Sequence, residues 1–152
     1  MEETKIKEYM RLALEEADKA YKEDEVPVGA IVVLDDKIIG RGHNHREKKN
    51  AIYSHAEIEA ILESEKFLGK WTLENASMFV TLEPCLMCAG AIKQARIKSL
   101  YYGASDKDEG AITSNYFVFD KIGKGSEILI YRDILKEDAE ALLKQYFKNK
   151  RR

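Results

Sequence analysis

Residues 77–92 read Ser-Met-Phe-Val-Thr-Leu-Glu-Pro-Cys-Leu-Met-Cys-Ala-Gly-Ala-Ile, and this stretch decides the fold class. Its first part, residues 77–82, is an apolar run that predicts a buried strand. Pro84 then suits the first turn of a helix, where its missing N–H costs nothing, and this helix is expected to end near Arg96. A further strand is expected at residues 99–104. Strands joined through a helix indicate a partly parallel sheet of the α/β class.

The flanking sequence extends this unit into a single domain over residues 1–152. Hydrophobic periodicity predicts further strands at 26–34, 38–41 and 127–131, and helices at 4–24, from Ser54 onward, and from 133 to about 150. Ser54 and Glu57 have the spacing of a capping box, so Ser54 is the expected N-cap of the middle helix. Residues 42–54 and 105–115 lack periodicity and are expected to be loops.

Composition excludes several classes of protein. A chain of 152 residues with 45% hydrophobic residues and a net charge of -2 suits one globular domain rather than a disordered chain. No apolar run approaches the ~18 residues of a membrane span, and the charged N-terminus does not resemble a secretory signal. We therefore expect a cytoplasmic protein without membrane association. Residues 144–152 carry five bases and no acid, which indicates either a phosphate contact or a solvated end of the chain.

Two short motifs carry metal chemistry. Cys85 and Cys88 are three residues apart, on one face of a helix and in its first turn, where the helix dipole favours thiolates. His55 would be a third ligand. A Cys/Cys/His set leaves a fourth position for water, which is typical of a catalytic zinc site. Zinc lowers the pKa of bound water toward ~7, and Glu57 can take the proton of that water and pass it on.

Three other interpretations stay open at this point. The cysteines can be a redox pair, or simply buried structural residues. His43 or His45 can complete a closed zinc site, in a zinc-stabilised RNA-binding module without catalysis. Taken together and in this order, however, the motifs match the pattern H-x-E…P-C-x-x-C of zinc deaminases that act on bases, which favours the catalytic interpretation.

A wider resemblance rests on six segments of the sequence, at residues 25–33, 42–44, 55–58, 80–92, 102–106 and 142–152. With them, nearly the whole chain resembles the bacterial tRNA-specific adenosine deaminases. The resemblance implies a three-layer α/β/α cytidine deaminase-like fold with a five-stranded mixed sheet. It also implies one zinc ion per subunit, no organic cofactor, a homodimer, and conversion of the wobble adenosine of a tRNA anticodon stem-loop to inosine.

Positions that match the family motifs acquire roles from the resemblance. It implies that zinc-bound hydroxide is the nucleophile, that Glu57 is the proton shuttle, and that the zinc ligands are His55, Cys85 and Cys88. It places in substrate binding the residues Asn44, Val28, Ala56, Pro84 and Asp106. It places on the RNA backbone the basic residues Lys148, Lys150, Arg151 and Arg152.

Three segments depart from the family pattern: residues 51–54, residues 110–114, and Gly125-Ser126-Glu127. The last stands where the family has Asn-His-Arg, and the loss of an arginine together with the gain of a glutamate weakens attraction for phosphate. This departure motivates an alternative substrate, a free nucleobase or nucleoside of the guanine, cytosine or adenosine type. None of the departures touches the metal ligands or Glu57.

Overall fold

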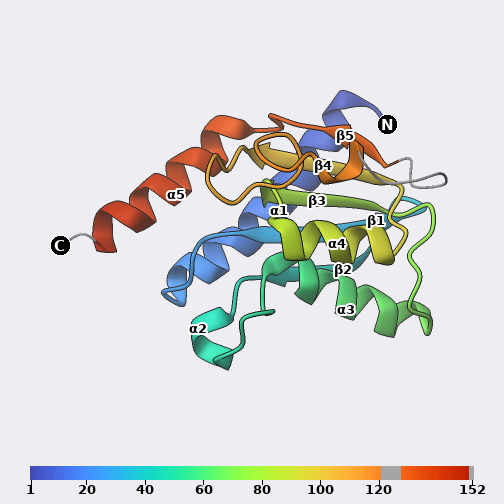
Figure 1. The fold of residues 1–152 in the computed structure, drawn as a ribbon, viewed down its shortest axis with the longest axis horizontal. Helices are drawn as coiled ribbons and strands as arrows, with labels where there is room; N and C mark the ends of the chain where they lie inside the picture. Colours follow the sequence, from blue (N-terminus) through green and yellow to red (C-terminus); the bar gives the residue numbers. More distant parts are fainter. Residues whose placement is uncertain (121–127, 151–152) are drawn as a thin grey trace.

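The computed structural model describes residues 1–120 and 128–150, and within them five strands form one mixed sheet (Figure 1). The sheet order is β2-β1-β3-β4-β5. Strand β1 pairs antiparallel with β2 and β3, whereas β4 pairs parallel with β3 and β5. The strands are β1 (Gly29–Leu34), β2 (Lys37–His43), β3 (Ser77–Leu82), β4 (Ser99–Ala104) and β5 (Leu129–Tyr131). The predicted mixed sheet is confirmed.

Helices cover both faces of this sheet (Figure 1). Helices α1 (Glu3–Lys22) and α5 (Lys136–Lys150) lie on one face, and α3 (Ala56–Leu68) and α4 (Leu86–Gln94) on the other. Each face has its own apolar core, since burial of the amphipathic helix faces drives the assembly. Between α1 and the sheet, the ring of Tyr9 on α1 packs on Phe79, and Phe79 stacks on Tyr101. The ring centroids are 5.2 Å apart in the first pair and 4.4 Å apart in the second. No helix in residues 1–120 and 128–150 is both long and apolar enough to span a membrane.

Two glycines in β2 bring α3 unusually close to the sheet. A Cβ atom at Gly42 would lie 2.4 Å from the carbonyl oxygen of Ala56, and one at Gly40 would lie 2.3 Å from that of Ala60. Both distances are far inside van der Waals contact, so only glycine fits at these crossings. The first turn of α3 is thereby pressed against the end of β2.

Two predictions about helix starts are wrong. The N-cap of α3 is His55 rather than Ser54, and the Oγ atom of Ser54 is buried with no hydrogen-bond partner among the described residues. The capping box fails because the Glu57 side chain is buried and the Asn44 side chain accepts the N–H of Ala56 instead. Pro84 does not lie in the first turn of α4, because that helix begins at Leu86 with Cys85 as its N-cap.

Several element boundaries also differ from the prediction. Strand β1 begins three residues later than expected, at Gly29, and the expected loop at 42–54 contains the short helix α2 (Arg46–Lys49). Helix α5 begins at Lys136 because Asp133 and Leu135 have φ angles of 64° and 51°, outside the right-handed helical region. A 3-10 turn, η1 (Val118–Asp120), ends the first described range. The predicted strand start at Glu127 lies outside the described residues.

Candidate functional site

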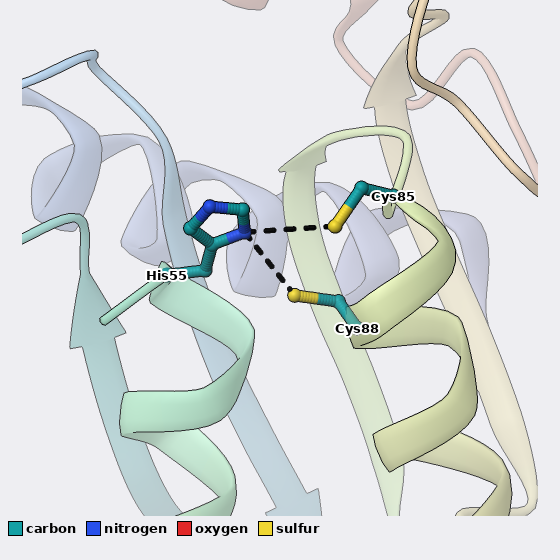
Figure 2. Close-up of side chains that lie close together, drawn as sticks. All are labelled: His55, Cys85 and Cys88. Carbon is teal, nitrogen blue, oxygen red and sulfur yellow. Dashed lines mark hydrogen bonds between the residues drawn. The ribbon is translucent and has the colours of Figure 1, made fainter. Parts of the chain in front are cut away.

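Three residues that the sequence singled out as metal ligands meet where two helices begin (Figure 2). His55 precedes α3, Cys85 precedes α4, and Cys88 lies in the first turn of α4. The Nδ1 atom of His55 lies 3.6 Å from Sγ of Cys85 and 3.4 Å from Sγ of Cys88. Figure 2 shows the imidazole of His55 directed at both sulfur atoms.

These distances fit a zinc ion. Tetrahedral zinc, with Zn–N near 2.0–2.1 Å and Zn–S near 2.3 Å, places its nitrogen and sulfur ligands about 3.6 Å apart. The observed separations match, and the ligand atoms of all three residues lie within 4.8 Å of one another. The group can therefore hold a metal ion, with one coordination position left for water.

The two thiols differ in acidity. Hydrogen bonding with Cys88 and His55 lowers the pKa of Cys85 to about 4. The hydrogen bond with Cys85, together with burial, raises the pKa of Cys88. The pKa of His55 is raised, chiefly by its hydrogen bond with Cys85. One thiolate is thus already present beside an imidazole, and a bound cation would displace the remaining protons.

Glu57 lies in the first turn of α3, next to this group. The residue is 4% exposed, and burial raises the pKa of its carboxyl to about 7. A hydrogen bond from its own backbone N–H and the charge of His55 offset only part of this effect. A carboxyl with that pKa both accepts and releases a proton near neutral pH, as a general base and acid must.

An open pocket of about 490 Å³ leads to these residues, a size typical of small-molecule sites. Three predicted substrate-binding residues line it, Val28, Asn44 and Asp106, together with His55, Glu57 and Cys85. Other lining residues were not predicted from the sequence: Val26, Arg46, Ile52, Leu82, Glu83, Leu86, Met87 and Glu109. Five of them lie within the quoted segments 25–33 and 80–92, where their residue types alone did not mark them as pocket lining, whereas Arg46, Ile52 and Glu109 lie outside every quoted motif.

The remaining two predicted substrate-binding residues lie behind the pocket wall. Ala56 is fully buried, and its N–H donates to Oδ1 of Asn44 at 2.9 Å. Pro84 is also buried, and its carbonyl accepts the N–H of Ala111 at 2.9 Å. The structure places both residues where they support lining residues rather than among them.

Glu83 is a positioning residue at the pocket, and its role could not be predicted from the local sequence. Its buried carboxylate accepts the backbone N–H groups of Asp106, Ile112, Thr113 and Ser114 at 2.8–3.1 Å, and the Ser114 hydroxyl at 2.5 Å. Burial alone would raise the pKa of Glu83, but these hydrogen bonds hold it below its ordinary value. Glu83 therefore fastens the loop that carries Asp106 to the junction of β3 and α4.

Two of the four predicted RNA-contacting residues, Lys148 and Lys150, lie on α5, and neither lines the pocket. Lys148 is exposed in a groove that it shares with Ala104 and Ser105, and Ser105 precedes the pocket residue Asp106. Lys150 forms an ion pair of 2.7 Å with Asp24. Arg151, Arg152 and the segment Gly125-Ser126-Glu127 lie outside the described residues.

His43 and His45 do not join the metal-ligating group of His55. They lie instead with Glu23 in a separate group. The hypothesis that His43 or His45 completes a four-ligand zinc site with His55, Cys85 and Cys88 is therefore wrong for the described residues.

Comparison with known proteins identifies the family. Residues 4–151 match the family model of MafB19-like deaminases. A tRNA-specific adenosine deaminase of Rickettsia felis is 45% identical over 141 residues, which cover 91% of this chain and 98% of that protein. The chain belongs to the tRNA-specific adenosine deaminase family. The tRNA-specific adenosine deaminase of Streptococcus pyogenes serotype M1 is 39% identical over 143 residues, covering 94% of this chain and 84% of that protein.

Solved structures agree with this family assignment. A tRNA:A34 deaminase, studied for A-to-I editing at the wobble position, superposes with a TM-score of 0.86 at 40% identity, covering 90% of this chain and 99% of that chain. A guanine deaminase from Nitrosomonas europaea superposes with a TM-score of 0.80 at 22% identity, covering 92% and 83%. At that identity the likeness shows the fold alone. The predicted three-layer cytidine deaminase-like fold is confirmed.

Proposed function

We propose that this chain converts the wobble adenosine of a tRNA anticodon loop to inosine by hydrolytic deamination, with one zinc ion per subunit held by His55, Cys85 and Cys88. The observation that carries the proposal is the protonatable carboxyl of Glu57, buried beside the metal-ligating group in one open pocket. Relatives named for tRNA adenosine deamination, 39% and 45% identical along more than nine-tenths of the chain, support the substrate.

Glu57 moves the protons that the reaction requires. A zinc ion at this site, when bound, makes water nucleophilic at neutral pH. Glu57 would carry one proton of the water that adds at C6 to the adjacent ring nitrogen, and would carry the second proton to the C6 amine, so that the C–N bond breaks, ammonia leaves and C6 becomes a carbonyl. Its pKa of about 7 suits both steps, because the carboxyl is neither permanently charged nor permanently protonated.

In this proposal Asn44 orients the base. Its Oδ1 atom is already engaged by the N–H of Ala56, which leaves the two amide N–H donors for an acceptor on the purine. Val28 contributes an apolar wall to the same pocket. Asp106 keeps its loop in shape, since its Oδ1 atom accepts the N–H groups of Asp108 and Glu109 at 3.2 and 3.1 Å.

The tRNA itself would be held outside the pocket. Bases in an anticodon loop are already unpaired, so turning one into the pocket costs less than extrusion from a duplex. Arg46 is exposed at the pocket, and Lys148 lies in the groove of α5. We assign phosphate contacts to these two residues and to Arg151 and Arg152. A tRNA substrate also favours action in the cytoplasm.

The decisive experiment measures inosine in an anticodon stem-loop that carries a wobble adenosine and a second loop adenosine. Zinc-loaded protein is expected to convert the wobble adenosine and to leave the second loop adenosine unchanged. The Glu57→Gln variant is expected to retain zinc but not to convert the wobble adenosine. Free adenine, guanine, cytosine and their nucleosides serve as competing substrates. Turnover of free bases without turnover of the stem-loop would show that the tRNA assignment is wrong, and absence of both would reject a deaminase.

We propose that the protein is a homodimer. We also propose that residues 1–152 form one domain in each subunit. Large apolar side chains are exposed on α3 and α4: Leu62, Phe67, Leu86 and Met87. Such side chains on two adjacent helices favour a protein interface. Sedimentation equilibrium of the full chain is expected to give the dimer mass, and a monomer at micromolar concentration would refute this assembly.

A further inference from the structure

A second group of potential metal ligands lies outside the pocket, between the end of α1 and the end of β2. It consists of Glu23, His43 and His45, whose ligand atoms lie within 4.8 Å of one another. The family motifs assign no role to any of the three. They differ from the first group in chemistry, since two imidazoles and a carboxylate replace one imidazole and two thiols.

The distances in this group fit a single coordinated ion. His43 Nε2 lies 3.3 and 3.2 Å from the two oxygens of the Glu23 carboxylate, and His45 Nε2 lies 3.5 Å from Oε1 of Glu23. Tetrahedral zinc with Zn–N and Zn–O bonds near 2.0–2.1 Å separates its ligand atoms by about 3.3 Å. The two imidazole rings have centroids 4.2 Å apart, and each ring presents its Nε2 atom to the Glu23 carboxylate.

The opposite nitrogen of each ring faces another carboxylate. Glu16 Oε1 lies 2.9 Å from Nδ1 of His43, and Glu59 Oε1 lies 3.8 Å from Nδ1 of His45. Histidines that bind metals usually donate their second ring N–H to a carboxylate, which fixes the tautomer and leaves the other nitrogen free to coordinate. His43 already has this arrangement. Nδ1 of His45 is buried and has no hydrogen-bond partner among the described residues, and a small movement toward Glu59 would supply one.

The charges of the surrounding carboxylates single out Glu23. Lys19 pairs with Glu16 at 2.7 Å, and Lys49 pairs with Glu59 at 2.8 Å. Within residues 1–120 and 128–150, Glu23 forms ion pairs with the two imidazoles alone. The Glu23 carboxylate therefore has no lysine partner in these ranges and faces only the two imidazoles.

We propose that Glu23, His43 and His45 form a second metal site, which takes Zn²⁺ or another divalent transition ion that prefers imidazole and carboxylate ligands. The side chains of His43, His45 and Glu23 are 13%, 19% and 28% exposed, so an ion reaches them from solvent without any rearrangement of the core. The three residues lie outside the lining of the catalytic pocket, and the proposal does not depend on the tRNA substrate.

An ion at this site would brace the pocket from behind. His43 and His45 flank Asn44, which lines the pocket and accepts the N–H of Ala56. Glu23 follows α1 directly. Coordination would therefore tie the segment that carries Asn44 to the end of α1, and the site is structural rather than catalytic.

The test uses the full chain without an affinity tag, stripped of metal with a chelator and titrated with Co²⁺. Cobalt at the cysteine site gives thiolate-to-metal charge-transfer absorption, whereas cobalt bound by two imidazoles and a carboxylate gives ligand-field bands only. We expect a second equivalent of Co²⁺ that adds ligand-field bands without further charge-transfer absorption. Glu23→Gln and His45→Gln are expected to lose this second equivalent and to keep the first.

Glu47→Gln is the matched control, because it removes a carboxylate from an exposed residue of the same region without touching the group. This variant is expected to bind both equivalents. The charge-transfer band at the first site reports that each variant is folded. Uptake of a single equivalent by the unmodified chain would overturn the proposal, as would a second equivalent that persists in both Glu23→Gln and His45→Gln.

Discussion

Glu57 and Glu83 are two glutamates that line the same pocket and are buried to nearly the same degree, at 4% and 2% exposure. Their surroundings are opposite. Glu83 accepts four backbone N–H groups and a hydroxyl, and its pKa lies below the ordinary value. Burial raises the pKa of Glu57 to about 7.

The difference teaches that burial alone does not decide what a carboxylate does. A buried carboxylate that accepts several hydrogen bonds stays deprotonated, and it can then hold a loop in place. A carboxylate whose charge is poorly compensated after burial can exchange its proton near neutral pH, which is the property that the proposed role of Glu57 requires. Two residues of one type at one pocket thus divide structure and chemistry between them, and this division can be tested by substitution.

The largest expected effect is on activity, at the Glu57 side of the comparison. Glu57→Gln keeps the shape of the side chain but cannot carry a proton, so kcat on the anticodon stem-loop is expected to fall roughly 10²–10⁴-fold. Zinc content and melting temperature are expected to stay at or above those of the unmodified chain. Glu63→Gln, an exposed position on the same helix, is the control. Equal activity in Glu57→Gln and the control would remove the catalytic role.

The Glu83 side should show the reverse pattern, a loss of stability. In Glu83→Gln the amide N–H₂ would face backbone N–H donors, and the free energy of unfolding is expected to fall by about 2–4 kcal/mol. Urea denaturation measures this change, with the exposed pocket residue Glu109→Gln as control. An unchanged midpoint in Glu83→Gln would mean that the loop holds itself in place without this carboxylate.

Asn44 sharpens the comparison, because one side chain there combines both kinds of role. Asn44→Ala loses the acceptor for the N–H of Ala56 and is expected to cost about 1 kcal/mol of stability. Asn44→Asp keeps that acceptor but lacks the amide donors. Both variants are expected to raise KM for the stem-loop, whereas only Asn44→Ala lowers the melting temperature. A normal KM in Asn44→Asp would contradict contact between the amide and the base.

The smallest effect concerns acid stability of the metal-free protein. Because the pKa of Glu83 is lower in the folded than in the unfolded chain, its contribution to stability is complete above the unfolded value near 4.3 and is lost as the pH falls through the folded value. The stability gap between the unmodified chain and Glu83→Gln should therefore be widest near neutral pH and narrow below about pH 4. Denaturation curves at several pH values, in chelator, test this, and a gap that widens in acid would reverse the assignment.

Local patterns pointed to the residues that meet in the metal-ligating group. His55 and Glu57 are two residues apart, and Cys85 and Cys88 are three apart, so each pair carries its chemistry in a short motif. The order of strands and helices followed from hydrophobic periodicity in the same way. The meeting of His55 with the cysteines, 30 and 33 residues away, was inferred from the chemistry of a Cys/Cys/His ligand set and was favoured by the zinc deaminase pattern.

What the sequence did not reveal depends on contacts between distant segments. The partners of Glu83 lie 23 to 31 residues further along the chain, and Glu23 is 20 residues from His43. Ser54 had the right type and spacing for an N-cap, yet a side chain from the preceding loop, Asn44, took the bond to the helix. Such competition between equivalent hydrogen-bond partners is decided by packing, which single-sequence patterns do not contain.

The crossing of β2 and α3 at Gly40 and Gly42 bears on how new substrate preferences can arise. At these positions any larger residue would push the helix that carries Glu57 off the sheet, since a Cβ atom at either would overlap backbone oxygens. Sequence libraries aimed at a different base should therefore leave the two glycines fixed. Diversity belongs in the mostly exposed residues on either side of the pocket mouth, residues 46–53 and 107–109. Substitutions at Gly40 and Gly42 would disturb the packing that positions Glu57, whereas substitutions of exposed residues at the pocket mouth would not.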